Sequence, residues 1–364
     1  MHMQGMAPAR AISVCAAALA LGALIACSTV AASTQVGASA VAPARPPTPA
    51  APVAGRQVPV AQGLAGMAFT PDGQRVLVTS NADNTLSEVD LPSGQVLRVW
   101  HDKVKIRTND GCLDNFCRGA GAVGVVVSKD GRTAYVTSMR EDAVSRLDLD
   151  KPQSTWATKV QRFPQSISLS PDGQTLWLFN LVANSISSVS TQNGKLTGKH
   201  IVLEGGSAHG LPFGRPASLA LSADGSRLFV TSGLADAMDV YDTRTRLRVA
   251  RTTPGAPFSI ATDPLANQVW TQHSDGLLVF DGQTLQAKKA MHYCRDLTSY
   301  HFALSADGQY LAISLPEENL ALVVEREGGL LTHALRTGDW PAQLAFTPDS
   351  RQLVVLNGDR KSVV

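Results

Sequence analysis

The sequence predicts an all-β fold, a seven-bladed β-propeller of four-stranded antiparallel blades. The first observation behind this prediction is a repeated unit, two apolar runs around a short polar turn, as in residues 67–80. The second is the spacing of the unit. Its turns fall at positions 72, 130, 172, 224, 265, 307 and 349, mostly 41 or 42 residues apart. A period of about 40 residues built from short strands is typical of propellers, because one sheet cannot bury both of its faces alone.

Each repeat supplies four strands, which we name A to D, starting with the strand before the turn. Most turns carry Asp-Gly, as at Asp72 and Gly73, and these residues favour tight turns. Strand A holds apolar residues three and five positions before the Asp, for example Phe69 and Met67. Burying one such side chain contributes about 1.5–3 kcal/mol, so the blades supply a large core without disulfides. Further strands are expected at 85–90 and 95–100 in blade 1, at 185–190 and 200–203 in blade 3, and at 238–241, 277–280 and 321–324 as C strands of blades 4 to 6.

The two ends of the repeat region predict how the ring closes. After the B strand of the last blade only residues 360–364 remain, enough for strand C and not for strand D. Residues 56–61 precede blade 1 and have no partner of their own. We therefore expect the N-terminal strand to serve as the outer strand of blade 7. Pro59 is compatible with that place, because an outermost strand needs only one row of hydrogen bonds.

The first 55 residues indicate export and a membrane anchor. Arg10 precedes an uncharged apolar segment ending in small residues, which is the pattern of a secretory signal peptide over residues 1–26. Residues 24–27, Leu-Ile-Ala-Cys, resemble a bacterial lipobox, which implies acylation of Cys27 and, with Ser28 following, attachment to the outer membrane from the periplasm. The alternative is an ordinary signal peptide cut nearby. Residues 27–55 then form an Ala- and Pro-rich tether, and residues 56–364 form the propeller.

The charge balance argues against one class of partner. Removing residues 1–26 takes away Arg10 and no acidic residue, leaving 31 basic and 30 acidic residues. No run of basic residues and no patch of alternating basic and aromatic residues occurs in the sequence. Because nucleic-acid binding depends mainly on neutralising phosphates, we expect no nucleic-acid partner.

The end of strand B carries a recognisable pattern. Residues 135–138, Tyr-Val-Thr-Ser, together with 229–232 and 77–80, resemble the YVTN-type repeat of secreted bacterial seven-bladed propellers. The resemblance implies relatives among lactonase-like hydrolases, streptogramin-type lyases, heavy subunits of quinone-dependent amine dehydrogenases, and periplasmic binding or metal-carrying propellers. These proteins share blades and differ in chemistry, so the fold does not choose among them. The sequence has no Cys-x-x-Cys-His haem motif and no Gly-x-Ser-x-Gly elbow.

Cysteine and histidine gather in one part of the predicted ring. The D–A and B–C loops share one face, here called the top face. The D–A loops contain Cys112, Cys117 and Cys294 together with His101, His209 and His292. Cys112 and Cys117 are expected to form a disulfide in an oxidising periplasm. The alternative is a zinc or copper site, because thiolates and imidazoles suit both metals. The metal candidates are His292, Cys294 and His301.

Five residues are candidates for ligand binding or catalysis at the mouth of the channel. His301 and Gln343 stand six positions before their turns, where the other blades have Gly or Ser. His301 or His273 could act as a base or a ligand, and His301 could instead only hydrogen-bond a backbone carbonyl. Arg215 could hold an anion and Trp340 could stack on a ring, unless Arg215 pairs with an acidic residue and Trp340 belongs to the core.

Three functions remain open from the sequence. The first is a lipid-anchored periplasmic propeller that binds a small ligand or a protein partner through the top face, in an assembly, carrier or accessory role. The second is a small-molecule enzyme of lactonase or lyase type, with His301 or His273 as base and Arg215 as anion holder. The third is a metal-binding or redox-accessory propeller.

Overall fold

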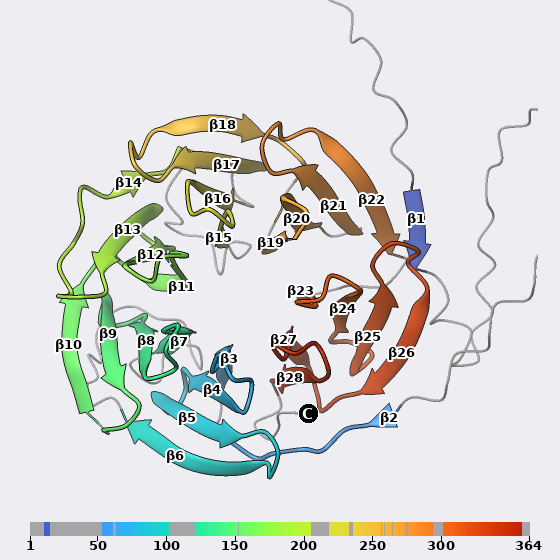
Figure 1. The fold of residues 1–364 in the computed structure, drawn as a ribbon, viewed down its shortest axis with the longest axis horizontal. Coiled ribbons are helices and arrows are strands. Elements are labelled where there is room, and N and C mark those ends of the chain that lie inside the picture. Colours follow the sequence, from blue (N-terminus) through green and yellow to red (C-terminus); the bar gives the residue numbers. More distant parts are fainter. Residues whose placement is uncertain are drawn as a thin grey trace, which may run out of the picture.

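The computed structural model is a ring of antiparallel sheets around a central axis (Figure 1). It describes residues 11–14, 53–60, 63–101, 121–151, 153–204, 218–232, 236–255, 257, 259–263, 265–273, 276–293 and 301–358. The regular secondary structure of these residues consists entirely of β-strands, which confirms the all-β prediction. Within the same residues there is no helix long and apolar enough to cross a membrane.

Six blades have four strands each, ordered from the centre outward as in the chain. Blades 1 to 3 are built from β3 (Leu64–Phe69), β4 (Arg75–Ser80), β5 (Thr85–Asp90) and β6 (Gln95–His101), from β7 (Ala122–Val127), β8 (Thr133–Ser138), β9 (Ala143–Asp148) and β10 (Gln153–Lys159), and from β11 (Pro164–Leu169), β12 (Thr175–Asn180), β13 (Ser185–Ser190) and β14 (Ile201–Val202).

The next three blades repeat this order. They are built from β15 (Leu219–Leu221), β16 (Arg227–Ser232), β17 (Ala237–Asp242) and β18 (Arg248–Thr252), from β19 (Ser259–Asp263), β20 (Gln268–His273), β21 (Gly276–Asp281) and β22 (Ala287–Tyr293), and from β23 (Phe302–Leu304), β24 (Tyr310–Leu315), β25 (Leu320–Glu325) and β26 (Leu331–Arg336). The chain then adds β27 (Pro341–Phe346) and β28 (Leu353–Asn357).

The prediction of seven four-stranded blades is wrong in number, because the structure has six. In the described part of the chain, the seventh repeat gives a sheet of two strands, β27 and β28. In the segment expected as its outer strand, Val58 forms a β-bridge, and none of the strands in the described residues is its partner. Just before this segment, β2 (Val53–Ala54) runs parallel to β26 at the outer edge of blade 6. Residues 359–364, the expected strand C, lie outside the described residues.

The N-terminal segment nevertheless spans the junction between the two-stranded sheet and blade 1. Val58 is buried and packs with Val76 of blade 1 and Leu356 of β28. The Arg56 guanidinium donates hydrogen bonds to the carbonyl oxygens of Leu91 (2.8 Å) and Pro92 (2.9 Å), in the C–D turn of blade 1. A hollow of about 420 Å³ remains between this segment, blade 1 and β28. Residues 56–58 thus connect the ends of the ring through side chains rather than through a full ladder.

The structure describes only a small part of the segment predicted to hold the signal peptide and the tether. β1 (Ala11–Val14) lies parallel to β22 at the outer edge of blade 5 (Figure 1). Cys27, with the rest of the lipobox, and most of the tether lie outside the described residues. The signal peptide, the acylation and the tether therefore remain predictions.

The Asp-Gly turns that define the repeat are held by local hydrogen bonds. Asp72 accepts one from the Thr70 hydroxyl at 2.5 Å and one from the backbone N–H of Gln74 at 3.0 Å, and both lower its pKa. The glycine that follows the Asp has positive φ, for example 68° at Gly73. The same two bonds recur at Asp130, Asp172, Asp224, Asp307 and Asp349. The turns are therefore structural features of the fold.

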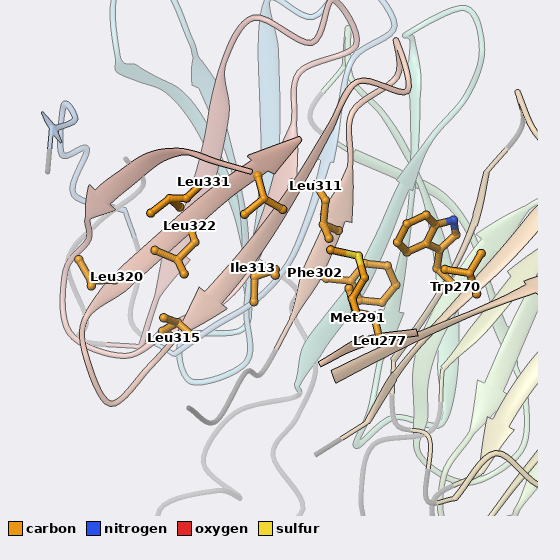
Figure 2. Packing of buried hydrophobic residues seen from close by; sticks show 12 residues of the cluster. Trp270, Leu277, Met291, Phe302, Leu311, Ile313, Leu315, Leu320, Leu322 and Leu331 are labelled. Atoms are coloured by element: carbon orange, nitrogen blue, oxygen red, sulfur yellow. The ribbon is translucent and has the colours of Figure 1, made fainter. Parts of the chain in front are cut away.

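The hydrophobic core lies between neighbouring blades. Figure 2 shows the cluster shared by blades 5 and 6, where Trp270 and Met291 face Phe302 and Ile313. All four of these side chains are at most 2% exposed. The predicted positions behave as expected, since Met67 and Phe69 pack against the preceding sheet in another such cluster. This packing holds the inner strands at a fixed spacing around the axis.

Candidate functional site

The candidate site is the top face, where the inner strands begin. These strands, β3, β7, β11, β15, β19, β23 and β27, surround the centre in Figure 1. In blades 1 and 2 the position six residues before the turn faces the following blade. A Cβ atom added to Gly66 would lie only 2.2 Å from the Val123 carbonyl oxygen of blade 2, and one added to Gly124 would lie 2.8 Å from Ile167 of blade 3. Blades 1 to 3 can therefore approach closely only because this position is glycine in blades 1 and 2.

The threonine of the YVTN-like pattern holds this end of the blade together. The Thr79 hydroxyl donates to the Val123 carbonyl oxygen at 2.7 Å, which joins blades 1 and 2. In blades 2 and 4, Thr137 and Thr231 accept a hydrogen bond from the backbone N–H of the residue at the glycine position. The pattern therefore has a structural role at this face.

His301 occupies the same position in blade 6 and is partly buried. Its backbone N–H donates to the Ser314 hydroxyl at 2.9 Å, so strand geometry positions the ring. The Nδ1 atom of the ring is buried and has no hydrogen-bond partner among the residues that the structure describes. Burial lowers the pKa of His301 to about 4, so the imidazole is neutral at pH 7. A neutral ring with an unused nitrogen can exchange a hydrogen bond with a ligand.

Other buried polar atoms at the top face also lack partners within the described ranges. Gln343 stands at the corresponding position of β27, beside blade 6, and its Oε1 atom is unbonded. Gln165 is the extra residue of a β-bulge in β11, on the other side of the centre, with the same deficit. In the B–C turns, Nη2 of Arg140 and Oε2 of Glu318 are likewise buried and unbonded. Because nearly all buried polar groups in proteins are satisfied, such a group of unsatisfied atoms requires an explanation.

Burial also shifts the pKa values of Arg140 and Glu318 in these two B–C turns. Desolvation lowers the pKa of Arg140 and raises the pKa of Glu318, whose neighbour Glu317 adds to the increase. Both shifts mean that the charged forms are poorly solvated at this face.

His273 does not share these properties. Its Nε2 atom lies 2.8 Å from the Thr271 hydroxyl and its Nδ1 atom lies 2.5 Å from the Gly255 carbonyl oxygen. The side chain is 4% exposed. Both ring nitrogens of His273 are thus engaged by the fold, a role that the sequence did not indicate for this residue.

Trp340 is an exposed aromatic residue with a left-handed backbone. It is 48% exposed, so it is not a core residue. Its φ is 59°, and Phe163, nine residues before its own turn as Trp340 is, has φ 66°. In blades 1 and 2 the equivalent residues are Gly63 and Gly121, which adopt this conformation without strain. A bulky residue in this conformation costs about 1–3 kcal/mol and is typical of functional positions.

Several predicted site residues are not brought together by the described part of the structure. Arg215, Cys112, Cys117 and Cys294 lie outside the described residues, so the anion holder and the disulfide remain predictions. His292 lies in β22, at the outer edge of blade 5, rather than in the following loop as expected. In the residues that the structure describes, no group of three His, Cys, Asp or Glu side chains could hold a metal ion. The zinc or copper site, which includes Cys294, also remains a prediction.

No sequence pattern predicted Gln165, Arg140 or Glu318 as site residues. Aligning the repeats singled out His301 and Gln343, because large polar residues replace Gly or Ser there. Gln165 stands one position earlier, where only the bulge between Pro164 and Ser166 gives it importance. No sequence signal distinguishes Arg140 and Glu318 from other polar residues in turns.

The fold and top face of this protein define a β-propeller with unsatisfied polar groups around the central axis. Comparison with known proteins places the chain in a family. The family model described as SGL, SMP-30/Gluconolactonase/LRE-like region, matches residues 50–261. The chain belongs to this family, which supports the lactonase-like part of the expected resemblance. The YVTN type remains a prediction.

Solved structures support the fold alone. Hydrazine synthase from Kuenenia stuttgartiensis is similar over 86% of this chain and 98% of that chain, with a TM-score of 0.67 and 16% identity. The Cps50 (Swd1) β-propeller domain of Myceliophteria thermophila is similar over 85% and 97%, with a TM-score of 0.67 and 15% identity. Among curated proteins, none matches this chain in sequence.

Proposed function

We propose that this protein is a lipid-anchored periplasmic propeller that binds a small polar molecule at its top face. The observation that carries the proposal is the group of buried, unbonded polar atoms on Gln165, His301 and Gln343. Leaving a buried polar atom unsatisfied costs about 1–3 kcal/mol, and a ligand that bonds to several of them removes this cost. A polar segment of a protein partner could occupy the same groups.

The chemistry of the groups favours an uncharged ligand rich in hydroxyl or amide groups. Gln165 and Gln343 offer neutral amides, and the lowered pKa of His301 keeps its ring neutral. Trp340 adds an exposed ring on which a sugar-like or planar molecule can stack. Such a ligand exchanges hydrogen bonds without bringing a charge into a partly dehydrated site.

Calorimetric titration with a polyol such as glucitol, and with glucono-lactone, tests the proposal. We expect saturable binding that weakens at least tenfold in Gln343→Leu and His301→Leu. Gln283→Leu, the same kind of change in an exposed turn on the opposite face, serves as the control and keeps full affinity. If none of the probes binds, or if the control weakens binding as much as the site variants, the proposed site is wrong.

Trp340→Gly separates binding from folding. Glycine relieves the left-handed backbone and loses about 0.5–1 kcal/mol through its greater freedom when unfolded, so stability changes little. Phe163→Gly, at the equivalent position of blade 3, is the matched variant. We expect Trp340→Gly to lose affinity at nearly unchanged stability. Unchanged affinity would remove the stacking role.

A lactone hydrolase is the second candidate, and membership of the SMP-30/gluconolactonase/LRE-like family favours it. Proton release from glucono-lactone measures this activity. A general base works best with a pKa near the working pH, so His301, with a pKa of about 4, is a weak base at pH 7. Rapid turnover that disappears in His301→Gln would place the hydrolase reading first.

The location is tested separately from the ligand. Membrane and soluble fractions of cells that express the full chain would be compared with cells that express Cys27→Ala. Several acyl chains hold a protein on a bilayer firmly, since each buried methylene contributes about 0.8 kcal/mol. We expect the variant to move to the soluble fraction. A wild-type chain already found there would rule out the anchor.

A further inference from the structure

A second hollow lies on the outside of the ring, between blades 3 and 4. It has a volume of about 650 Å³, within the usual range for sites of small molecules. Its lining includes one acidic residue, Glu204, together with Lys199, His200, Val202, Arg246, Leu247 and Arg248, and we call it the outer hollow. It lies beside the C–D turn of blade 4, which faces away from the top face.

The outer hollow exists because the last strand of blade 3 is interrupted. Leu196 pairs with Val189, and five residues later Ile201 pairs with Ile186. Residues 198–200 therefore lie opposite the single residue 187 and form a wide bulge. Bulges of this kind redirect side chains and are common beside binding sites.

Arg246 fills the space that the bulge opens. Its guanidinium lies 5.3 Å from the centre of the Trp177 ring and donates to the Lys199 carbonyl oxygen at 3.1 Å and to the Thr197 hydroxyl at 2.9 Å. A Cβ atom added to Gly198 would lie only 2.8 Å from this group. Arg246 has φ 62°, a left-handed conformation that is strained for arginine. Bulge, glycine and arginine thus form one built arrangement.

Its positive charge has no carboxylate partner among the described residues. The nearby acids are already paired, since Glu204 contacts Arg248 at 2.6 Å and Asp239 contacts Arg251 at 2.7 Å. Neither Arg246 nor Lys199 takes part in an ion pair within the same part of the chain. Burial lowers the pKa of Arg246, and burial together with the charge of Arg246 lowers the pKa of His200. The wall of the outer hollow is therefore positive and incompletely solvated.

Apolar side chains stand at the rim next to this charge. Val202 is 76% exposed and Leu247 is 67% exposed, among the most exposed large apolar residues that the structure describes. Single exposed apolar residues are ordinary, but here two of them border the same cationic hollow.

We propose that the outer hollow binds a small amphiphilic anion, a carboxylate or phosphate group on an apolar chain. The anionic group lies against Lys199 and Arg246, where it supplies the missing negative charge. The apolar chain covers Val202 and Leu247 and removes their surface from water. The binding involves no covalent step, and it does not depend on the function proposed for the top face.

Calorimetry with four soluble probes tests each half of this proposal. The protein is the full chain carrying Cys27→Ala, which needs no detergent. Octanoate and octyl phosphate have both a charge and a chain, whereas octanol lacks the charge and acetate lacks the chain. We expect saturable binding of the first two only. Octanol that binds as tightly as octanoate, or acetate that displaces octanoate at equal concentration, would overturn the proposal.

Matched variants locate the binding. Lys199→Gln removes an exposed charge and keeps the carbonyl that Arg246 uses, so it should fold normally and bind octanoate about three- to fivefold more weakly. Lys195→Gln, on the same blade outside the outer hollow, should bind like wild type. Val202→Ser with Leu247→Ser should also weaken binding, and Trp340→Gly at the top face should not. Equal effects of Lys199→Gln and Lys195→Gln would refute the location.

Discussion

Replacing Gly66 by alanine is the most direct test of how the inner strands are spaced. The new Cβ would lie 2.2 Å from the Val123 carbonyl oxygen and 3.1 Å from the Thr79 hydroxyl. Blade 2 would have to shift by roughly 1 Å to restore normal contact distances. Overpacking of this kind costs about 1–3 kcal/mol. The 2.7 Å hydrogen bond from Thr79 to Val123 would also weaken, at a cost of about 1 kcal/mol, so the expected loss is about 2–4 kcal/mol.

Equilibrium unfolding in urea measures this loss through the midpoint and the slope. Ser166→Ala, at the same position of blade 3, is the control, because it removes a hydroxyl and adds no atom. It should stay within about 0.5 kcal/mol of wild type. If Gly66→Ala is as stable as Ser166→Ala, the inner strands are not held at contact distance. The explanation given for glycine at this position would then fail.

The other predictions concern pH and two polar contacts. Because folding lowers the pKa of His301 from 6.5 to about 4, the unfolded chain binds the proton first, and stability should fall as the pH decreases from 6.5 to 4. In urea titrations at pH 7 and 4.5, the decrease in the free energy of unfolding should be about 1–3 kcal/mol smaller in His301→Gln than in wild type. An unchanged pH dependence would contradict the burial of the ring. Asp239→Asn should cost about 1–3 kcal/mol in thermal unfolding, because Arg251 donates two hydrogen bonds, of 2.7 and 2.9 Å, to that buried carboxylate and can only partly rehydrate. Arg56→Ala should cost about 1 kcal/mol or less, since its contacts to blade 1 are exposed; a loss above 3 kcal/mol would mean that the ring depends on this contact.

The repeat could be predicted from the sequence because its signals are local. The Thr70 hydroxyl and the Gln74 N–H bind Asp72 within five residues of chain, and Gly73 supplies the positive φ that the turn needs. Apolar positions such as Met67 and Phe69 follow from the two-residue period of a strand. These interactions are the same in every copy, so counting copies located the A and B strands.

The number of complete blades could not be predicted in the same way. A complete blade also requires C and D strands that pair in the right register, and their sequences vary more than the turn does. The seventh copy has the turn at Asp349 and strands β27 and β28, but its outer partners depend on the two ends of the chain. Val53 pairs with Leu335 of blade 6 instead, a long-range choice that no local pattern encodes.

Departures from the repeat identify the candidate site better than motifs do. A position that is glycine in two blades and tryptophan in another cannot be explained by the turn, because Gly63 and Gly121 meet the same backbone requirement without strain. The side chain of Trp340 is also half exposed, so the core does not explain it either. The same reasoning applies to His301, which carries a buried, unbonded nitrogen where Gly66 carries no side chain. Features that the fold does not require, and that cost it stability, support the proposal of a ligand site at the top face.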